Sequence, residues 1–163
     1  IEIVREHACF GGVQGLYSHA SSSCSGNMQF AVYSPPQARD RRVPVLVFLS
    51  GLTCNEETFA IKAGAQRLAS ELGLMLVTPD TSPRDTGIPG AIGDWEFGEA
   101  ASYYVDATIA PWSSQFRMES YVARELPALV AAAGLRPRAV RLEKFGGPVD
   151  RLLPRQWLHG GTG

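Results

Sequence analysis

The stretch VPVLVFLSGLTCNEETFAIKAGAQRLASELGLMLVTP, residues 43–79, decides the fold. It opens with a continuous run of β-branched, aliphatic and aromatic residues over 43–49, which predicts a central strand buried on both faces. A second apolar run over 74–78 ends at Pro79 and predicts another buried strand. A strand, a helix and a second strand form a βαβ unit, whose right-handed crossover makes the two strands parallel. The chain is therefore expected to be of the α/β class.

The segment between these strands predicts one helix over 56–72. Thr53 followed by Glu56 matches a capping box, and Asn55 is an alternative cap. Gly73 supplies the left-handed residue that ends the helix. Apolar residues at spacings of four, three and four form one stripe for burial, namely Ile61, Ala65, Leu68 and Leu72.

The flanking segments extend this unit in both directions. Residues 28–33 predict a strand of an antiparallel pair, and 80–118 form a long irregular segment at the edge where open α/β sheets bind ligands. A second helix is predicted over 118–133 with a kink at Pro127, and one more strand over 138–145. The stripe of that helix and its terminating glycine are Val122, Leu126, Leu129, Ala133 and Gly134.

The net charge and the cysteine spacing restrict the classes of partner that we expect the protein to bind. The 163 residues carry 15 Lys plus Arg and 16 Asp plus Glu, a net charge of −1, so we expect no nucleic-acid partner. No apolar run approaches the roughly 20 residues that span a bilayer, so no membrane is expected. Cys9, Cys24 and Cys54 fall in no metal-ligand spacing, which predicts no metal and reduced thiols in a cytoplasmic protein. The chain starts at Ile1 without a secretory signal, and we expect a few preceding residues to be missing.

A family resemblance rests on ordered blocks spread over residues 7 to about 133. The blocks are Cys9-Phe10-Gly11-Gly12, Met28 to Tyr33, Leu49-Ser50-Gly51-Leu52-Thr53-Cys54, Lys62-Ala63-Gly64, Pro79-Asp80-Thr81-Ser82-Pro83-Arg84, Asp94-Trp95-Glu96-Phe97-Gly98, Tyr104-Val105-Asp106-Ala107-Thr108, Pro111-Trp112 and Glu125-Leu126-Pro127-Ala128-Leu129. Together they resemble the S-formylglutathione hydrolases, also called the esterase D family. The resemblance implies a three-layer α/β-hydrolase sandwich with a Ser-Asp-His triad. It also implies hydrolysis of S-formylglutathione to glutathione and formate, in formaldehyde detoxification, without a cofactor.

The sequence departs from that family where the nucleophile belongs. The family carries a Gly-x-Ser-x-Gly elbow on the turn after the second helix. Phe145-Gly146 matches its start, but Gly147-Pro148-Val149-Asp150 follows, and no Gly-x-Ser-x-Gly occurs in the sequence. We therefore interpret 1–135 as the amino-terminal part of an α/β-hydrolase domain, truncated before the elbow. We interpret 136–163 as a divergent tail that is either out of frame or a real variant. Since no triad member is present, the chain by itself is expected to be inactive.

The strongest candidate site is the loop over 50–54. The resemblance implies that Leu52 donates its backbone N–H to the oxyanion of a tetrahedral intermediate. The substrate-pocket candidates are Gly51, Thr53, Cys54 and Trp95. Residue types alone favour simpler roles: a tight turn at Gly51, a helix cap at Thr53 and core packing for Trp95. Cys54 is either a thiol of lowered pKa or a small apolar filler, and His7 and His19 are expected to be structural.

Three functions stay open on the sequence. The first is an S-formylglutathione hydrolase acting on a small-molecule thioester. The alternatives are a non-catalytic α/β-hydrolase-like binding module and a carboxylesterase of the same fold. A homodimer is compatible with each of them, and the sequence does not determine the preferred acyl group.

Overall fold

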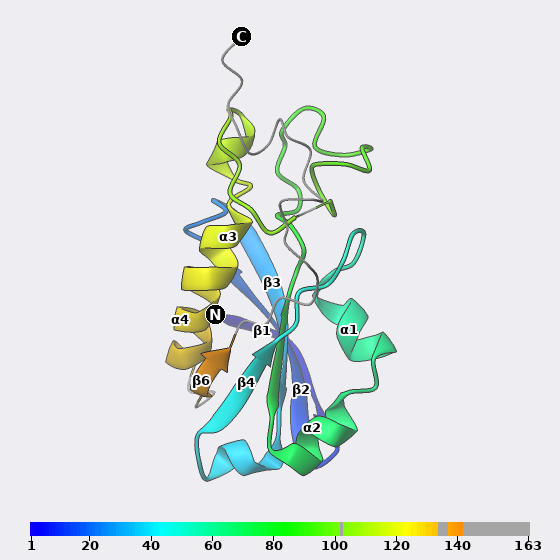
Figure 1. The fold of residues 1–163 in the computed structure, drawn as a ribbon, viewed down its shortest axis with the longest axis vertical. Coiled ribbons are helices and arrows are strands. Elements are labelled where there is room, and N and C mark those ends of the chain that lie inside the picture. Colours follow the sequence, from blue (N-terminus) through cyan, green and yellow to red (C-terminus); the bar gives the residue numbers. More distant parts are fainter. Residues whose placement is uncertain (102, 134–136, 142–163) are drawn as a thin grey trace.

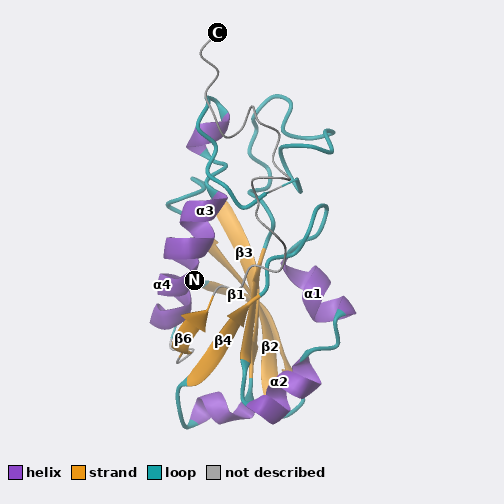
Figure 2. Cartoon of the chain, viewed as in Figure 1, coloured by secondary structure: helices purple, strands orange, loops and turns teal. Residues whose placement is uncertain are grey.

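A single mixed sheet forms the centre of the molecule in the computed structural model, which describes residues 1–101, 103–133 and 137–141. The described strands follow the order β1-β2-β3-β5-β4-β6 (Figure 1). Helices α1 and α2 cover one face, and α3, η3 and α4 cover the other (Figure 2). The predicted three-layer α/β architecture is therefore confirmed. The strands are β1 (Glu2–Cys9), β2 (Gly12–Ala20), β3 (Asn27–Ser34), β4 (Val43–Val47), β5 (Met75–Pro79) and β6 (Pro137–Arg141).

The antiparallel half of the sheet contains a hairpin that the sequence pattern does not predict. Strands β1 and β2 pair with Cys9 opposite Gly12. The two turn residues, Phe10 and Gly11, have φ values of 43° and 75°, as a type I′ turn requires. Phe-Gly is not one of the usual pairs for this turn, and the two strands lack a clear alternation of polar and apolar residues. Strand β3 pairs antiparallel with β2 and with β5, which confirms the antiparallel strand expected over 28–33.

The parallel half of the sheet follows the βαβ prediction. Strands β4 and β5 are parallel, with Val45 opposite Met75, and β6 adds a further parallel strand beside β4. Every residue of β5 is buried, as expected for a strand covered on both faces. The same expectation is wrong for β4, where Pro44 is exposed and Leu46 is half-buried. The thinner layer formed by α1 and α2 covers that face of β4 only in part.

The helical connection between β4 and β5 is broken into two helices, α1 (Glu56–Lys62) and α2 (Gln66–Leu72). Gly64 lies between them with a φ of 59°, a left-handed conformation that stops the first helix. The predicted apolar stripe is wrong, because Ile61, Leu68 and Leu72 are between 55 and 75% exposed. The buried residues of α2 are Gln66 and Ala69, so this helix packs on the sheet with a different side from the one that carries Leu68 and Leu72. The predicted end at Gly73 is confirmed by its φ of 66°.

The second helical segment is continuous but contains a π-helical turn. It comprises α3 (Met118–Ser120), η3 (Tyr121–Glu125) and α4 (Leu126–Ala132). The wide turn of η3 ends two residues before Pro127. Proline has no N–H to donate to the preceding turn, and the π-helical geometry adapts the helix to this missing hydrogen bond. This turn also shifts the buried stripe to Met118, Val122, Leu126 and Val130, whereas Leu129 is half-buried and Ala133 is exposed. Gly134, the expected end, lies outside the described residues.

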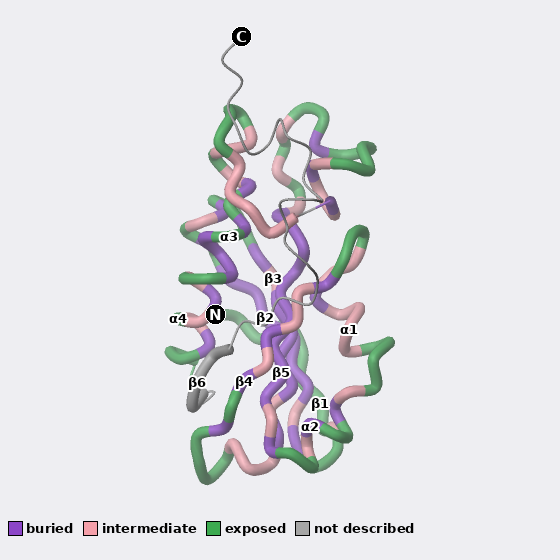
Figure 3. Tube along the Cα trace, in the orientation of Figure 1, coloured by how far each residue is buried: buried purple, intermediate pink, exposed green. Residues whose placement is uncertain are grey.

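Buried residues follow the central strands (Figure 3), and they form cores of different size on the two faces of the sheet. The larger core joins the sheet to α3, η3 and α4, and Phe30, Met75, Met118, Tyr121 and Leu126 are fully buried in it. The smaller core lies against α1 and α2 around Tyr33, Ala69 and Leu76. Two short 3₁₀ helices complete the described elements, η1 (Pro36–Arg39) and η2 (Trp112–Ser114). None of the helices in the described part of the chain has the length and apolar character needed to cross a membrane.

Candidate functional site

The candidate loop over 50–54 leaves the sheet at the carboxyl end of β4. The Phe48 N–H donates to the Val77 carbonyl oxygen at 2.8 Å, which keeps the chain beside β5 for one residue past the strand. Ser50 is buried, and the Tyr104 hydroxyl donates to its carbonyl oxygen at 2.7 Å. The Ser50 hydroxyl oxygen is itself buried and has no hydrogen-bond partner among the residues that the structure describes. The loop therefore starts from a fixed point on the sheet.

The backbone N–H groups of the loop are used unequally. Thr53 N–H donates to the Ala100 carbonyl oxygen at 2.8 Å, and Cys54 N–H donates to the Gly51 carbonyl oxygen at 3.1 Å. Leu52 N–H makes no hydrogen bond within 1–101, 103–133 and 137–141, and Leu52 is 44% exposed. A free backbone donor in this loop is the group that an oxyanion hole requires.

Asn55, and not Thr53, caps helix α1. The Asn55 Oδ1 atom accepts hydrogen bonds from Glu57 N at 3.2 Å and Thr58 N at 3.1 Å, and Thr58 Oγ1 accepts one from Asn55 N. The alternative cap is thus confirmed, and the capping box between Thr53 and Glu56 is wrong. Thr53 instead has a φ of 64°, a left-handed conformation that is uncommon for a β-branched residue. At this point the chain turns sharply, and the Ala100 carbonyl holds that turn.

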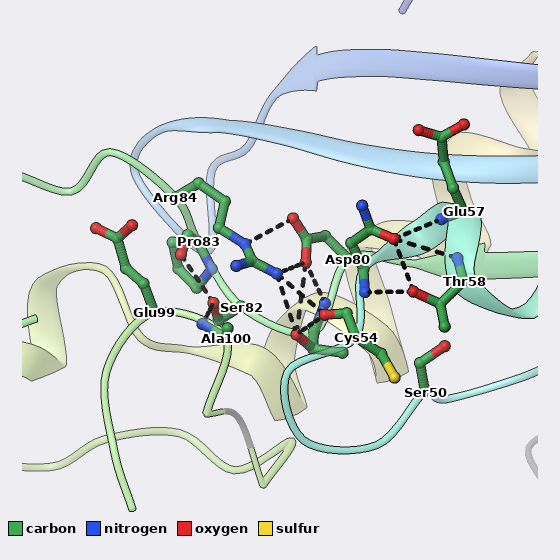
Figure 4. A network of polar contacts seen from close by, with 12 residues as sticks. Ser50, Cys54, Glu57, Thr58, Asp80, Ser82, Pro83, Arg84, Glu99 and Ala100 are labelled. Carbon is green, nitrogen blue, oxygen red and sulfur yellow. Dashed lines mark hydrogen bonds and ion pairs between the residues drawn. The ribbon is translucent and has the colours of Figure 1, made fainter. Parts of the chain in front are cut away.

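A polar network at the end of β5 contacts the loop at the Cys54 carbonyl (Figure 4). Arg84 binds both oxygens of the buried Asp80 carboxylate, with Nε–Oδ2 at 3.0 Å and Nη2–Oδ1 at 2.6 Å. The same Nη2 atom donates to the Cys54 carbonyl oxygen at 3.0 Å, and Thr81 Oγ1 donates to that oxygen at 2.7 Å. Sequence reasoning assigned no site role to these residues. The available signal was an aspartate followed four residues later by an arginine, directly after a parallel strand.

A polar pocket of about 680 Å³ lies beside this network. Thr53, Asn55 and Glu56 line it from the loop and the start of α1, and Asp80 and Arg84 line it from the end of β5. Glu56 is buried, and burial raises the pKa of its carboxyl group, with a further rise from the neighbouring Asp80 carboxylate. Thr53 is the predicted pocket residue that this pocket includes.

The other predicted pocket residues, Gly51, Cys54 and Trp95, do not line this polar pocket. Gly51 adjoins open space, since a Cβ atom there would meet nothing within 4 Å, so crowding does not require glycine at that position. Cys54 is a half-buried free cysteine, and the choice between a reactive thiol and a filler stays open. Trp95 is 73% exposed, so the alternative of core packing is wrong for this residue, and its pocket role stays a prediction.

The histidines behave as structural residues where the structure describes them. His19 is buried, stacks on Tyr121 with ring centroids 5.7 Å apart, and has Nε2 at 3.1 Å from the Tyr121 hydroxyl. Burial lowers the pKa of His19. His7 is exposed on β1. No group of three or more His, Cys, Asp or Glu side chains suited to a metal ion occurs in the described part of the chain.

The expected tail lies almost entirely beyond the described residues. Phe145 and Gly146, which resemble the start of an elbow, belong to 142–163, for which the structure describes no placement. The division of the chain at 135/136 therefore stays a prediction.

Comparison with known proteins identifies the class. A family model described as "Putative esterase" matches residues 21–138, and the chain belongs to this esterase family. The fold is also similar to that of a ferulic acid esterase, with a TM-score of 0.57 and 16% identity over 80% of this chain and 48% of that chain. The class is therefore an α/β-fold esterase.

Relatives with higher sequence identity are S-formylglutathione hydrolases. The chain is 48% identical over 129 residues to the S-formylglutathione hydrolase of Mus musculus, and 50% identical over 129 residues to that of Paracoccus denitrificans. Each match covers 79% of this chain and 46% of the relative. The solved S-formylglutathione hydrolase from Agrobacterium tumefaciens is similar with a TM-score of 0.78 and 45% identity, over 81% of this chain and 48% of that structure. The chain thus spans about half the length of the relatives it matches.

Proposed function

We propose that this chain forms the oxyanion-hole half of a serine hydrolase that cleaves S-formylglutathione. The observation that carries the proposal is the Leu52 N–H, which has no hydrogen-bond partner among the described residues, whereas the following N–H groups of Thr53 and Cys54 are bonded. The names of the relatives at 48 and 50% identity support the substrate. A cytoplasmic location and a place in formaldehyde catabolism belong to the same proposal.

The proposed reaction adds water across a thioester bond. A nucleophile attacks the formyl carbon, whose carbonyl oxygen becomes an oxyanion, and Leu52 N–H donates a hydrogen bond to that oxygen. Collapse of the intermediate breaks the carbon–sulfur bond, and the glutathione sulfur leaves and takes up a proton. Water then releases formate from the acyl-enzyme. A histidine base must come from residues outside loop 50–54, because that loop holds no histidine.

A hybrid enzyme tests this proposal. The matching 129 residues of the Paracoccus denitrificans relative are replaced by those of this chain, and hydrolysis of S-formylglutathione is measured. We expect turnover, and we expect Leu52→Pro, which removes the N–H, to lower kcat by about 10²- to 10³-fold. Leu52→Ala keeps the N–H and serves as the matched control, with little change in kcat.

Each alternative predicts a different result. A hybrid that cleaves p-nitrophenyl acetate but not S-formylglutathione would assign the site to a carboxylesterase. A folded hybrid without either activity would favour a binding module. Equal losses in Leu52→Pro and Leu52→Ala would contradict the role of the N–H.

A further inference from the structure

We infer that Arg84 is a positioning residue for the oxyanion hole, acting through the Cys54 carbonyl to hold the loop that presents Leu52 N–H. The inference rests on the proposed function, because it assigns that N–H a catalytic purpose. Arg84 is far from Leu52 along the chain and follows a different strand, so only the folded structure connects them.

Arg84 is itself held rigidly. Its guanidinium binds both oxygens of Asp80, and the Asp80 Oδ1 atom also accepts the Thr81 N–H at 2.6 Å. Asp80 is buried, and the Arg84 side chain is only 34% exposed. A planar guanidinium bound at two points has one orientation, so the second N–H of its Nη2 atom is aimed at a fixed place. That place is the Cys54 carbonyl oxygen, at 3.0 Å.

Among the described residues, the loop is held at three points, and two of them depend on residues 80–84. Arg84 and Thr81 together donate two hydrogen bonds to the Cys54 carbonyl. The Ala100 carbonyl accepts from Thr53 N–H, while the Ala100 N–H donates to Ser82 Oγ at 2.8 Å, which fixes Ala100 against the same segment. The third point, the hydrogen bond from Tyr104 to Ser50, is independent of this segment.

The backbone of the loop needs such support. Thr53, directly after Leu52, has a left-handed conformation that a β-branched residue adopts only where its surroundings impose it. A relaxation of Thr53 toward ordinary φ values would rotate the peptide group that joins it to Leu52, and Leu52 with its N–H would be displaced. The bonds to Thr53 and Cys54 prevent this relaxation. Figure 4 shows Arg84 in contact with both Asp80 and Cys54, whereas Ser50 lies on the other side of Cys54.

The first test uses the full 163-residue chain and needs no activity. Amide hydrogen exchange of Thr53 is measured by NMR in the unaltered chain and in Arg84→Lys, which keeps the charge but cannot make all three bonds. We expect exchange to become about tenfold faster at Thr53, with little change at buried β5 amides. The matched control is Arg67→Lys, because Arg67 pairs with Glu71 at the same i,i+4 spacing but on the exposed face of α2. Unchanged exchange at Thr53 would overturn the inference.

The second test separates positioning from general stability. In the hybrid enzyme, Arg84→Lys is expected to lower kcat by about tenfold to a hundredfold with KM changed less than about twofold, since a displaced donor affects the transition state. Thr81→Val removes the other donor to Cys54 and should act in the same direction, which keeps the test valid if Arg84→Lys does not fold. A loss confined to KM would overturn the inference. An inactive parent hybrid would contradict the proposed function alone, and the exchange measurement would still decide the role of Arg84.

Discussion

Glu125 joins the π-helical turn of η3 to the connection between β2 and β3, and its replacement by glutamine is expected to destabilise the chain. One carboxylate oxygen accepts hydrogen bonds from Ser21 Oγ at 2.9 Å and Ser23 N at 2.8 Å. The other accepts one from Ser22 N at 2.9 Å. The side chain is only 13% exposed, so water competes poorly for these bonds.

The magnitude follows from the bonds that glutamine keeps. A hydrogen bond to a charged group contributes about 1.5–3 kcal/mol, and a bond between neutral groups about 0.5–1.5 kcal/mol. With the amide oxygen of glutamine facing Ser21 and Ser23, two bonds weaken by about 1 kcal/mol each. The third bond is lost, but Ser22 is exposed and its N–H is hydrated instead. We therefore expect Glu125→Gln to lower the free energy of unfolding by about 2–3 kcal/mol near neutral pH.

The pH dependence provides a sharper test than the magnitude. Burial pushes the pKa of Glu125 up, but the hydrogen bonds from Ser23, Ser22 and Ser21 outweigh it and leave the pKa below its ordinary value. A lowered pKa in the folded state stabilises the protein above the ordinary pKa, and this stabilisation is lost as the pH falls through the lowered value. His19 Nδ1 lies 3.8 Å from the carboxylate, and burial lowers the pKa of His19, so near neutral pH the ring is neutral and adds little.

Urea unfolding followed by tryptophan fluorescence measures the effect at about pH 7 and about pH 3. The control is Glu119→Gln, an exposed glutamate in the same helical segment, for which we expect a change within about 0.5 kcal/mol. A cost for Glu125→Gln that is as large at the lower pH, or no larger than that of the control, would refute the reasoning.

Three further outcomes are expected. Glu56→Gln should stabilise the chain increasingly as the pH rises, because a raised pKa in the folded state means that ionisation of this buried carboxyl opposes folding; urea unfolding across pH measures this, and a pH-independent effect would contradict it. Asn55→Ala should lower the free energy of unfolding by about 1 kcal/mol through loss of the α1 cap, whereas Asn55→Gly should cost only a few tenths, and equal costs would count against the cap. The 163-residue polypeptide should hydrolyse neither S-formylglutathione nor p-nitrophenyl acetate, because its sequence holds no Gly-x-Ser-x-Gly; turnover that a serine-directed phosphonate abolishes would disprove this.

Local sequence patterns were sufficient for the parallel half of the sheet. The apolar runs over 43–49 and 74–78 are too short for helices and too apolar for exposed strands, so a parallel pair with a crossover helix was the remaining solution. Gly73 was also predictable as a helix end, because its left-handed conformation is a local property that glycine adopts without strain.

The burial of side chains was decided by the tertiary structure. The stripe through Ile61, Leu68 and Leu72 assumed a continuous helix, but the chain forms two helices separated at Gly64, and all three side chains are exposed. The burial prediction for the second helical segment was wrong at fewer positions. The π turn at Tyr121–Glu125 shifts the register by less than a full turn, so Val122 and Leu126 stay buried. A helical period predicts a face only as long as the backbone keeps that period.

The candidate site shows the same division. The sequence identified the loop over 50–54, because a strand that ends at Ser50-Gly51 and a helix that starts soon afterwards are local features, and the family resemblance singled out Leu52. Only the folded chain determines which N–H groups of that loop are occupied, because the acceptor for Thr53 is the Ala100 carbonyl. Arg84 likewise reaches the Cys54 carbonyl across two strand ends. Hydrogen bonds between segments distant in sequence leave no periodic pattern in either segment, so they are decided when the strands pair and bring their carboxyl ends together.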